Sequence, residues 1–468
     1  MEAHAFISER GSGHRKLVGM SGYKGKVQKL LGSTSIEVGD RVRVEKAGSV
    51  YEGVLMPRTE LGDPNHIVLK LASGYNIGIK LDREVKLARI EKGQPPRLGI
   101  PPLEIKRDSS KPDVSIVGTG GTIASRVDYR TGGVYPAFTP EEIYSAVPEL
   151  AELANIKVIE ACNVFSEHMT PELWVKIGRV IAKELNSGAS GVVVAHGTDT
   201  MGYTAAALSF MLKDLCRPVV LVGSQRSSDR PSSDAALNLI GAVTVAGKSD
   251  IAEVCVVMHG SPEDDFCLIH RGTKVRKCHT SRRDTFQTIN DIPIGMVRGT
   301  ELKFFRKDYK RASPQGEVKV DGKFEPRVAL LKVTPGMPSS VIEGMLRAGD
   351  KGIVLEGTGL GHVPESLFDG IKRAVKRGVP VVMTSQCLWG RVDMKVYSTG
   401  RDLLQLGVIP GEDMLPEIAY VKLMWVLPHA KGGEEVSKLM RTNLAGEITP
   451  RTRPDIFLKP VFSLKASD

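Results

Sequence analysis

The sequence predicts an α/β fold with a parallel sheet in two domains, preceded by a small SH3-like β-barrel. From residue 113 onward, apolar strand-like runs alternate with helix-like segments, a pattern typical of a parallel sheet that helices cover on both faces. Before residue 92, short runs alternate between apolar and polar residues and are separated by turn residues, which is typical of a small antiparallel barrel. The length of 468 residues is enough for about three domains.

Residues 1–35 are predicted to form a basic, flexible N-terminal segment. Glycine and serine are mixed there with basic residues such as Arg10, Arg15 and Lys24 and with two acids, Glu2 and Glu9. A stretch of this composition buries too little apolar surface to order itself without a partner.

Residues 36–91 are predicted to form the barrel. Strand-like runs lie at 40–44, 50–55, 67–71 and 75–79, with turn residues between them. The barrel could dock a partner or contact RNA, or it could serve only as a spacer. Residues 92–112 follow as a linker, because Pro95, Pro96, Pro101, Pro102 and Pro112 disfavour a helix and favour an extended chain.

The α/β part begins with a buried strand, Val114–Val117, that runs into the glycine-rich turn 118–122. In open α/β sheets, ligands bind where the chain leaves the carboxyl ends of the strands. A phosphate loop is one reading of this turn, but Ile123 replaces the third glycine of the dinucleotide fingerprint and no Walker lysine follows. The turn therefore presents hydroxyl groups, with Thr122 at its end.

Further elements continue the alternation to the C-terminus. Thr139 and Thr170 each precede Pro and Glu, which is a helix start with a hydroxyl N-cap. A polar stretch at 303–326 is predicted to link two halves, so we place domains at 113–321, with the active site, and at 322–468. The remaining strands are predicted at 191–195, 218–222, 253–258, 328–333, 352–355 and 379–383, and further helices at 232–246 and 364–377.

Composition excludes several classes of protein. Hydrophobic residues make up 41% and charged residues 25%, no run is long enough to span a membrane, and the N-terminus is unlike a signal peptide, so we expect a cytoplasmic protein. The six cysteines form no C-x-x-C pair and the ten histidines are dispersed, so we expect no metal and no cofactor. The net charge of +10 favours an anionic partner such as RNA, although ordinary solvated surfaces carry a similar surplus.

Threonines at two strand ends are the candidate chemical groups. Thr122 ends the glycine turn, and Thr198 with Asp199 follows the strand at 191–195. A threonine hydroxyl becomes a useful nucleophile only when a base or cation helps to remove its proton, and Lys274 or Lys277 could take that part. Each of these residues could equally serve as a helix cap or as a solvated surface charge.

Three segments together resemble the L-asparaginase and glutaminase family. Residues 119–124 and 196–201 are similar to its two signature motifs, and residues 275–280 are similar to its lysine-bearing segment. The resemblance implies that Thr122 is the nucleophile that forms an acyl-enzyme. It also implies that Thr198, Asp199 and Lys277 form a second catalytic group, with Lys277 fitting the motif better than Lys274.

The same resemblance implies a set of substrate-binding residues. Tyr135 is similar to the family's mobile tyrosine, and Ser166 with Glu167 is similar to the pair that binds the amino-acid head group. His362 occupies the position where asparaginases often carry an asparagine that reaches across a dimer interface, so that contact is not expected here.

The barrel and linker ahead of these motifs resemble the D subunits of archaeal glutamyl-tRNA(Gln) amidotransferases. That resemblance implies a glutaminase that passes ammonia to an E subunit, which uses ATP and Mg²⁺ to convert Glu-tRNA(Gln) to Gln-tRNA(Gln). It implies a hetero-oligomer, a dimer of heterodimers, that self-associates through the asparaginase-like domains and meets tRNA(Gln) through the complex. A free-standing asparaginase with an accessory barrel and a non-catalytic tRNA-binding scaffold are the rival hypotheses.

Overall fold

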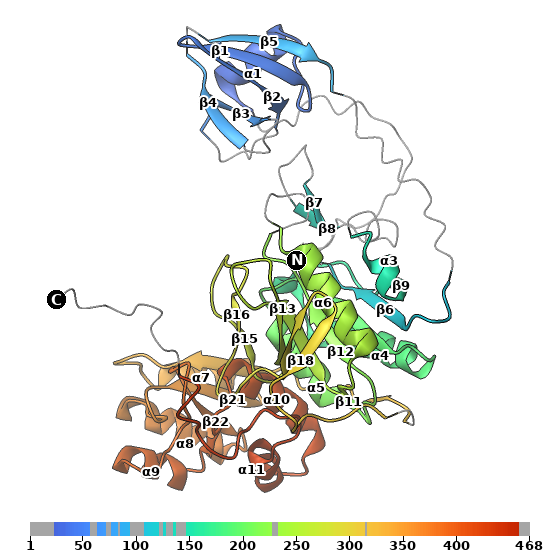
Figure 1. Cartoon of the computed structure of the whole chain (residues 1–468). Helices are drawn as coiled ribbons and strands as arrows, with labels where there is room; N and C mark the ends of the chain where they lie inside the picture. Colours follow the sequence, from blue (N-terminus) through green and yellow to red (C-terminus); the bar gives the residue numbers. More distant parts are fainter. Residues whose placement is uncertain are drawn as a thin grey trace, which may run out of the picture. The chain divides into compact units, whose positions relative to one another are not determined.

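The computed structural model describes residues 23–56, 63–71, 76–82, 85–93, 107–120, 125–127, 134–136, 147–226, 233–313 and 316–457. The chain forms two compact units, of which the smaller contains a five-stranded sheet and the larger contains an eight-stranded and a four-stranded sheet (Figure 1). The predictions for residues 1–22, for most of the linker and for the helix start at Thr139 lie outside the described residues.

The sheet of the smaller unit is antiparallel, with the strand order β4-β3-β2-β1-β5. Val42 and Val44 alternate with exposed residues in β1, as the period-two pattern predicts. Four predicted strands are therefore confirmed, whereas β5 was not predicted because only one of its residues is even partly buried. The strands are β1 (Arg41–Lys46), β2 (Ser49–Leu55), β3 (His66–Leu71), β4 (Asn76–Lys80) and β5 (Lys86–Glu91).

The prediction of a flexible segment up to residue 35 is wrong for its last third. Helix α1 (Gly25–Ser33) is ordered, and Val27 and Leu31 are buried in the same apolar cluster as the strands of the small sheet. The Tyr23 hydroxyl donates a hydrogen bond to the Met56 carbonyl at 2.7 Å and accepts one from the Val68 amide at 3.0 Å. The spacing of Val27 and Leu31, four residues apart, is the signal that composition alone did not reveal.

The eight-stranded sheet has the order β18-β17-β14-β13-β12-β10-β6-β9. From β13 to β9 the neighbouring strands are parallel. Every residue of β10, β12 and β13 is buried, which requires cover on both faces of the sheet. The parallel strands are β6 (Asp113–Gly118), β9 (Asn155–Glu160), β10 (Gly191–Ala195), β12 (Val219–Val222) and β13 (Val254–His259).

The other part of this sheet is antiparallel, which the alternation of strands and helices in the sequence did not reveal. Strands β14 (Cys267–Arg271), β17 (Gly295–Arg298) and β18 (Glu301–Phe304) continue from β13 by antiparallel pairing. Part of the stretch predicted as a linker, residues 303 and 304, therefore belongs to the edge strand. Residues 299 and 300 alone join β17 to β18, and so short a turn requires antiparallel pairing, because a parallel connection needs a long crossover.

Helices α3 (Leu150–Leu153), α4 (Pro171–Asn186), α5 (Met201–Met211) and α6 (Ala235–Lys248) accompany the large sheet. The predicted start of α4 is confirmed: the Thr170 hydroxyl accepts a hydrogen bond from the Leu173 amide, and Pro171 occupies the first turn. The face of α4 that carries Trp174, Ile177 and Ile181 is buried.

The four-stranded sheet of the C-terminal half is parallel, with the order β20-β21-β22-β23. Its helix α10 (Pro416–Val426) is buried along almost its whole length and packs against α5 of the other sheet. The remaining elements of this half are β20 (Val328–Lys332), β21 (Gly352–Gly357), β22 (Val381–Ser385), β23 (Ile409–Pro410), α7 (Ser340–Ala348), α8 (Phe368–Lys376), α9 (Ser398–Gln405), α11 (Gly433–Arg441), η3 (Glu365–Leu367) and η4 (Leu427–His429).

Three small two-stranded sheets complete the set of described strands. They are β7 (Ser125–Val127) with β8 (Val134–Pro136), β11 (Leu212–Lys213) with β19 (Lys319–Val320), and β15 (Val275–Lys277) with β16 (Phe286–Thr288). Among the described residues, no helix has the length and apolar character needed to cross a membrane.

Candidate active site

The candidate residues follow three strands that are neighbours in the large sheet. Strands β9, β6 and β10 lie side by side and are parallel, so their carboxyl ends meet at one edge. The short helix η2 (Ser166–His168) comes after β9, the glycine turn comes after β6, and Thr198 comes after β10. The fold thus brings these chain segments to the place where α/β sheets bind their ligands.

The glycine turn after β6 is held tightly at its beginning. The backbone amide and the hydroxyl of Thr119 both donate to the Ala195 carbonyl, at 3.1 Å and 2.9 Å. Gly120 has φ +102°, and a Cβ at this position would lie 2.3 Å from the Val164 carbonyl oxygen. Only glycine fits there. Thr122 and the side chain of Tyr135 lie outside the described residues.

Lys277 connects Thr198 and Asp199. Its Nζ atom donates to Thr198 Oγ1 at 2.9 Å and to Asp199 Oδ1 at 2.7 Å. Thr198 is buried, the Lys277 side chain is 15% exposed, and the Asp199 side chain is 68% exposed. An ammonium beside a hydroxyl favours the charged form of that oxygen, so this arrangement can assist proton removal from Thr198 or from a water beside it. The exposed carboxylate can also bind a substrate cation.

A buried chain of hydrogen bonds fixes the turn that carries Thr198. The Trp174 indole N–H donates to Thr204 Oγ1 at 3.1 Å, and Thr204 Oγ1 lies 2.9 Å from His196 Nε2. His196 Nδ1 lies 2.6 Å from the Gly197 carbonyl. Because that carbonyl can only accept, Nδ1 carries the proton and Nε2 accepts from Thr204. Burial lowers the pKa of His196 to about 4, so the imidazole is neutral and acts as a fixed spacer.

Close packing against glycines positions the neighbouring hydroxyls. A Cβ on Gly197 would lie 2.7 Å from the Cβ of Ser166, and a Cβ on Gly223, after β12, would lie 2.9 Å from Thr198 Cγ2. The Thr200 hydroxyl donates to the Ser166 carbonyl at 2.6 Å. Ser166 is therefore buried beside the turn that carries Thr198, whereas Glu167 is exposed and has no hydrogen-bond or ion-pair partner among the described residues.

The two candidate lysines occupy different environments. Lys274 is 1% exposed and its Nζ atom donates to Asp413 Oδ2 at 2.7 Å, far along the chain in the C-terminal half. Only Lys277 contacts the Thr198 and Asp199 pair. His362 lies in the C-terminal half, where its ring packs edge-on against Tyr397.

Sequence reasoning did not identify the buried residues that hold the turn of Thr198 in place but do not belong to the candidate catalytic residues. His196 is the first residue of the motif at 196–201, and Thr204 lies on the first turn of α5, where the two side chains pair. The signal available in the sequence was this pair of polar side chains eight positions apart, with His196 directly after an apolar strand and Thr204 directly before the apolar run of α5. Among the described residues, no cluster of three His, Cys, Asp or Glu side chains could hold a metal ion.

Comparison with known proteins assigns each part of the chain to a family. The model described as "Asparaginase, N-terminal" matches residues 113–310, "Glutaminase/Asparaginase C-terminal domain" matches residues 327–440, and "GatD N-terminal domain" matches residues 36–90. The L-asparaginase structure from Thermococcus kodakarensis is 38% identical with a TM-score of 0.66, covering 72% of this chain and all of that one. L-asparaginase I from Vibrio cholerae is 33% identical with a TM-score of 0.65, covering 72% of this chain and 99% of that one. Fold and sequence together define an asparaginase-type α/β protein with an added N-terminal β unit.

Relatives of nearly the same length narrow this class. The D subunit of glutamyl-tRNA(Gln) amidotransferase from Pyrococcus abyssi is 57% identical over 440 residues, which cover 93% of this chain and 100% of the relative. The protein of the same name from Methanopyrus kandleri is 53% identical over 437 residues, covering 92% of this chain and 95% of the relative. The chain belongs to the family of glutamyl-tRNA(Gln) amidotransferase D subunits.

Proposed function

We propose that this chain is the glutaminase subunit of a tRNA-dependent amidotransferase in the cytoplasm. It hydrolyses glutamine to glutamate and ammonia and supplies the ammonia to a partner E subunit. The partner uses ATP and Mg²⁺ to activate the glutamate of Glu-tRNA(Gln), which the ammonia converts to Gln-tRNA(Gln). The assembly is a dimer of such heterodimers, self-associated through the asparaginase-like domains, and it meets tRNA(Gln) as a complex.

The observation that carries this proposal is the contact of one amine, on β15, with a buried hydroxyl and an exposed carboxylate that follow the carboxyl end of β10. Lys277 Nζ lies within hydrogen-bonding distance of both Thr198 and Asp199. A free amino acid needs a carboxylate for its ammonium group, and Asp199 is exposed enough to provide it. Ser166, buried beside Gly197, and Glu167 complete the head-group site together with Tyr135.

The proposed reaction has two steps, formation of an acyl-enzyme and its hydrolysis. The Thr122 oxygen attacks the side-chain amide carbon of glutamine, its proton moves to the leaving nitrogen, and ammonia departs from a threonine acyl-enzyme. Thr198 and Lys277 then relay a proton from water, which attacks the ester carbon and releases glutamate with the Thr122 hydroxyl restored. The role of Thr122 rests on the resemblance of residues 119–124 to the family motif and on the position of Gly120 at the start of its turn.

A Thr122→Ala variant of the two-protein complex tests this proposal. Glutamine-dependent formation of Gln-tRNA(Gln) should fall to background, while formation from added ammonium should remain, because the E subunit still receives its nucleophile. Thr122→Ser is the matched control, since it keeps a hydroxyl at the same position. Loss of the ammonium-dependent reaction in Thr122→Ala, or unchanged glutamine hydrolysis, would contradict the proposed division of roles.

The solved L-asparaginases favour a second candidate, a free-standing amidohydrolase with an accessory barrel. The two functions differ in their dependence on partners. Rapid ammonia release from glutamine or asparagine by the isolated chain would support the free enzyme. Release that requires the E subunit and charged tRNA would support the amidotransferase.

A further inference from the structure

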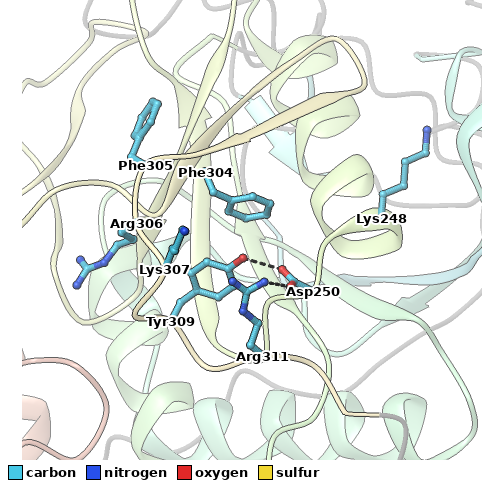
Figure 2. A pocket seen from close by; sticks show the side chains of 8 residues that line it. All are labelled: Lys248, Asp250, Phe304, Phe305, Arg306, Lys307, Tyr309 and Arg311. Atoms are coloured by element: carbon cyan, nitrogen blue, oxygen red, sulfur yellow. Dashed lines mark hydrogen bonds and ion pairs between the residues drawn. The ribbon is translucent and has the colours of Figure 1, made fainter.

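A pocket of about 450 Å³ lies at the edge of the large sheet that is opposite to the candidate active site (Figure 2). Asp250 precedes the first residue of β13, whereas Thr198 follows the last residue of the parallel strand β10, so the two lie at opposite ends of the sheet. The lining of the pocket comes from the end of α6, from the segment before β13, and from the end of the edge strand β18 with the residues after it. The lining residues are Lys248, Asp250, Phe304, Phe305, Arg306, Lys307, Tyr309 and Arg311.

Aromatic rings form one wall of this pocket. The Phe304 ring stacks on Tyr309 with centroids 5.2 Å apart and planes at 24°, and the Arg311 guanidinium lies 4.5 Å from the Tyr309 centroid. The Tyr309 hydroxyl donates to Asp250 Oδ1 at 2.8 Å, which holds the ring in place. Phe304 is 36% exposed and Phe305 is 41% exposed. The site therefore offers an aromatic platform of two exposed rings, Phe304, which Tyr309 holds in place, and Phe305, which points away from Phe304 (Figure 2).

Positive charge surrounds the platform. The nine residues Lys303–Arg311 contain five basic side chains and one acid, Asp308. Arg306 is paired with Asp291 and Asp308, and Arg311 is paired with Asp250. In contrast, the side chains of Lys248, Lys303 and Lys307 have no ion-pair or hydrogen-bond partner in the part of the chain that the structure describes. These three ammonium groups are available to an anionic ligand.

We propose that this surface, Lys248 together with Lys303–Arg311, binds an unpaired stretch of nucleic acid. Sites for single strands combine cations that follow the phosphates with aromatic rings on which bases stack, and this surface supplies both. Bases stack on the exposed rings of Phe304 and Phe305, and Lys248, Lys303 and Lys307 contact the phosphates. A protein partner fits less well, because the cores of protein interfaces are depleted in lysine. The proposal goes beyond the glutaminase function and does not depend on it.

Binding of a fluorescein-labelled oligouridine to the full chain at low salt tests this surface. Phe305→Ala should weaken binding by about 5- to 150-fold, the range found when one stacking ring is removed. Phe305→Tyr keeps the ring and should bind as the native chain does. The double variant Lys303→Gln/Lys307→Gln should lower the slope of log affinity against log salt by about 1.4, since each phosphate contact to a single strand contributes about 0.7.

Lys372 and Lys376 provide the matched control. Both are exposed on α8 of the other sheet, and their change to Gln removes the same net charge. Equal weakening by this control pair would overturn the proposal, because it would show a general charge effect. Unchanged binding in Phe305→Ala, tighter binding of duplex RNA than of the single strand, or dissociation of a self-associated species by Phe305→Ala in sedimentation would overturn it as well. Glutamine hydrolysis, measured in parallel, should be unchanged in every variant.

Discussion

Lys274 Nζ and Asp413 Oδ2 lie 2.7 Å apart, and their side chains are only 1% and 3% exposed. Lys274 directly precedes β15 in the half of the chain with the large sheet, and Asp413 follows β23 in the other half. Burial lowers the pKa of Lys274, and the opposing charge of Asp413 acts to keep the ammonium form. The Asp413 carboxylate also accepts from the amide and the hydroxyl of Thr449, and the Arg391 guanidinium lies 3.6 Å from it.

Substitution of Lys274 should therefore lower stability, whereas substitution of Lys277 should remove activity. Lys274→Met leaves Asp413 charged and buried without its hydrogen-bonded ammonium, with the Arg391 guanidinium at 3.6 Å as the remaining cation, and the free energy of unfolding should fall by about 3 kcal/mol. Lys277→Met removes a partly exposed amine and should change stability by no more than about 1 kcal/mol, while glutamine turnover is lost. Denaturant unfolding and ammonia release measure the two effects. A Lys277→Met protein that is active, or as unstable as Lys274→Met, would contradict these assignments.

Gly223 limits the space beside Thr198. An added Cβ would lie 2.6 Å from the His196 carbonyl and 2.9 Å from Thr198 Cγ2, so Gly223→Ala must displace the turn that carries Thr198. We expect kcat to fall at least about tenfold and the protein to lose about 1–3 kcal/mol of stability. Gly344→Ala is the control, because a Cβ there meets nothing within 4 Å on helix α7, and it should add about 0.5–1 kcal/mol. Native kcat in Gly223→Ala would show that the turn tolerates displacement.

Two buried imidazoles make stability depend on pH. Burial lowers the pKa of His196 to about 4 and that of His270 to about 3, below the ordinary value of 6.5. Between pH 6.5 and about 4 the unfolded chain binds protons that the folded chain does not, so stability falls as pH falls. The slope should be about 1.4 kcal/mol per pH unit for each imidazole.

Denaturant unfolding at pH 7.5, 6.5 and 5.5 measures this dependence. Nearly constant stability is expected above pH 6.5, with a decline below it. The variant His270→Gln removes one titrating group and can keep a hydrogen bond to Thr288, so its slope below pH 6.5 should be shallower by about 1.4 kcal/mol per unit. Equal slopes for the two proteins would mean that His270 is protonated in the folded state.

The hydroxyl of Tyr23 should stabilise the smaller unit. Tyr23→Phe removes the partner of both the Met56 carbonyl and the Val68 amide, which should lower the local free energy of unfolding by about 1–3 kcal/mol. Hydrogen exchange of the Val68 amide should accelerate accordingly, while exchange in β10 of the larger unit should stay unchanged. Unchanged exchange at Val68 would indicate that residues 23–35 are flexible, as the composition suggested.

Strands whose residues are apolar throughout could be predicted from sequence, because burial on both faces demands that composition. β10 and β12 are of this kind, whereas β6 also contains Asp113 and Ser115. Local chemistry also determined the start of α4, since Thr170 and Pro171 act within one turn. The antiparallel strands β14, β17 and β18 could not be predicted in this way, because their direction depends on which neighbours they meet.

The candidate group shows the same division. The types and order of Thr198, Asp199 and Lys277 suggested one site. Thr198 and Lys277 are 79 positions apart in the sequence, however, and only the tertiary fold brings them into contact. The motif resemblance alone favoured Lys277 over Lys274. The burial of Lys274 and its pairing with Asp413 could not be predicted, because both lysines belong to the same short basic stretch of sequence. The boundary near residue 322 and the role of Thr122 stay predictions.

The pairing of Lys274 with Asp413 gives the short strand β15 two anchors. Its beginning is fastened to the C-terminal half, and its last residue, Lys277, reaches the hydroxyl and carboxylate after β10. A displacement of one sheet relative to the other would shift β15 and move the amine of Lys277 at its end. The C-terminal half thus takes part in holding the amine beside Thr198, although the contacts of Lys277 themselves lie in the other half.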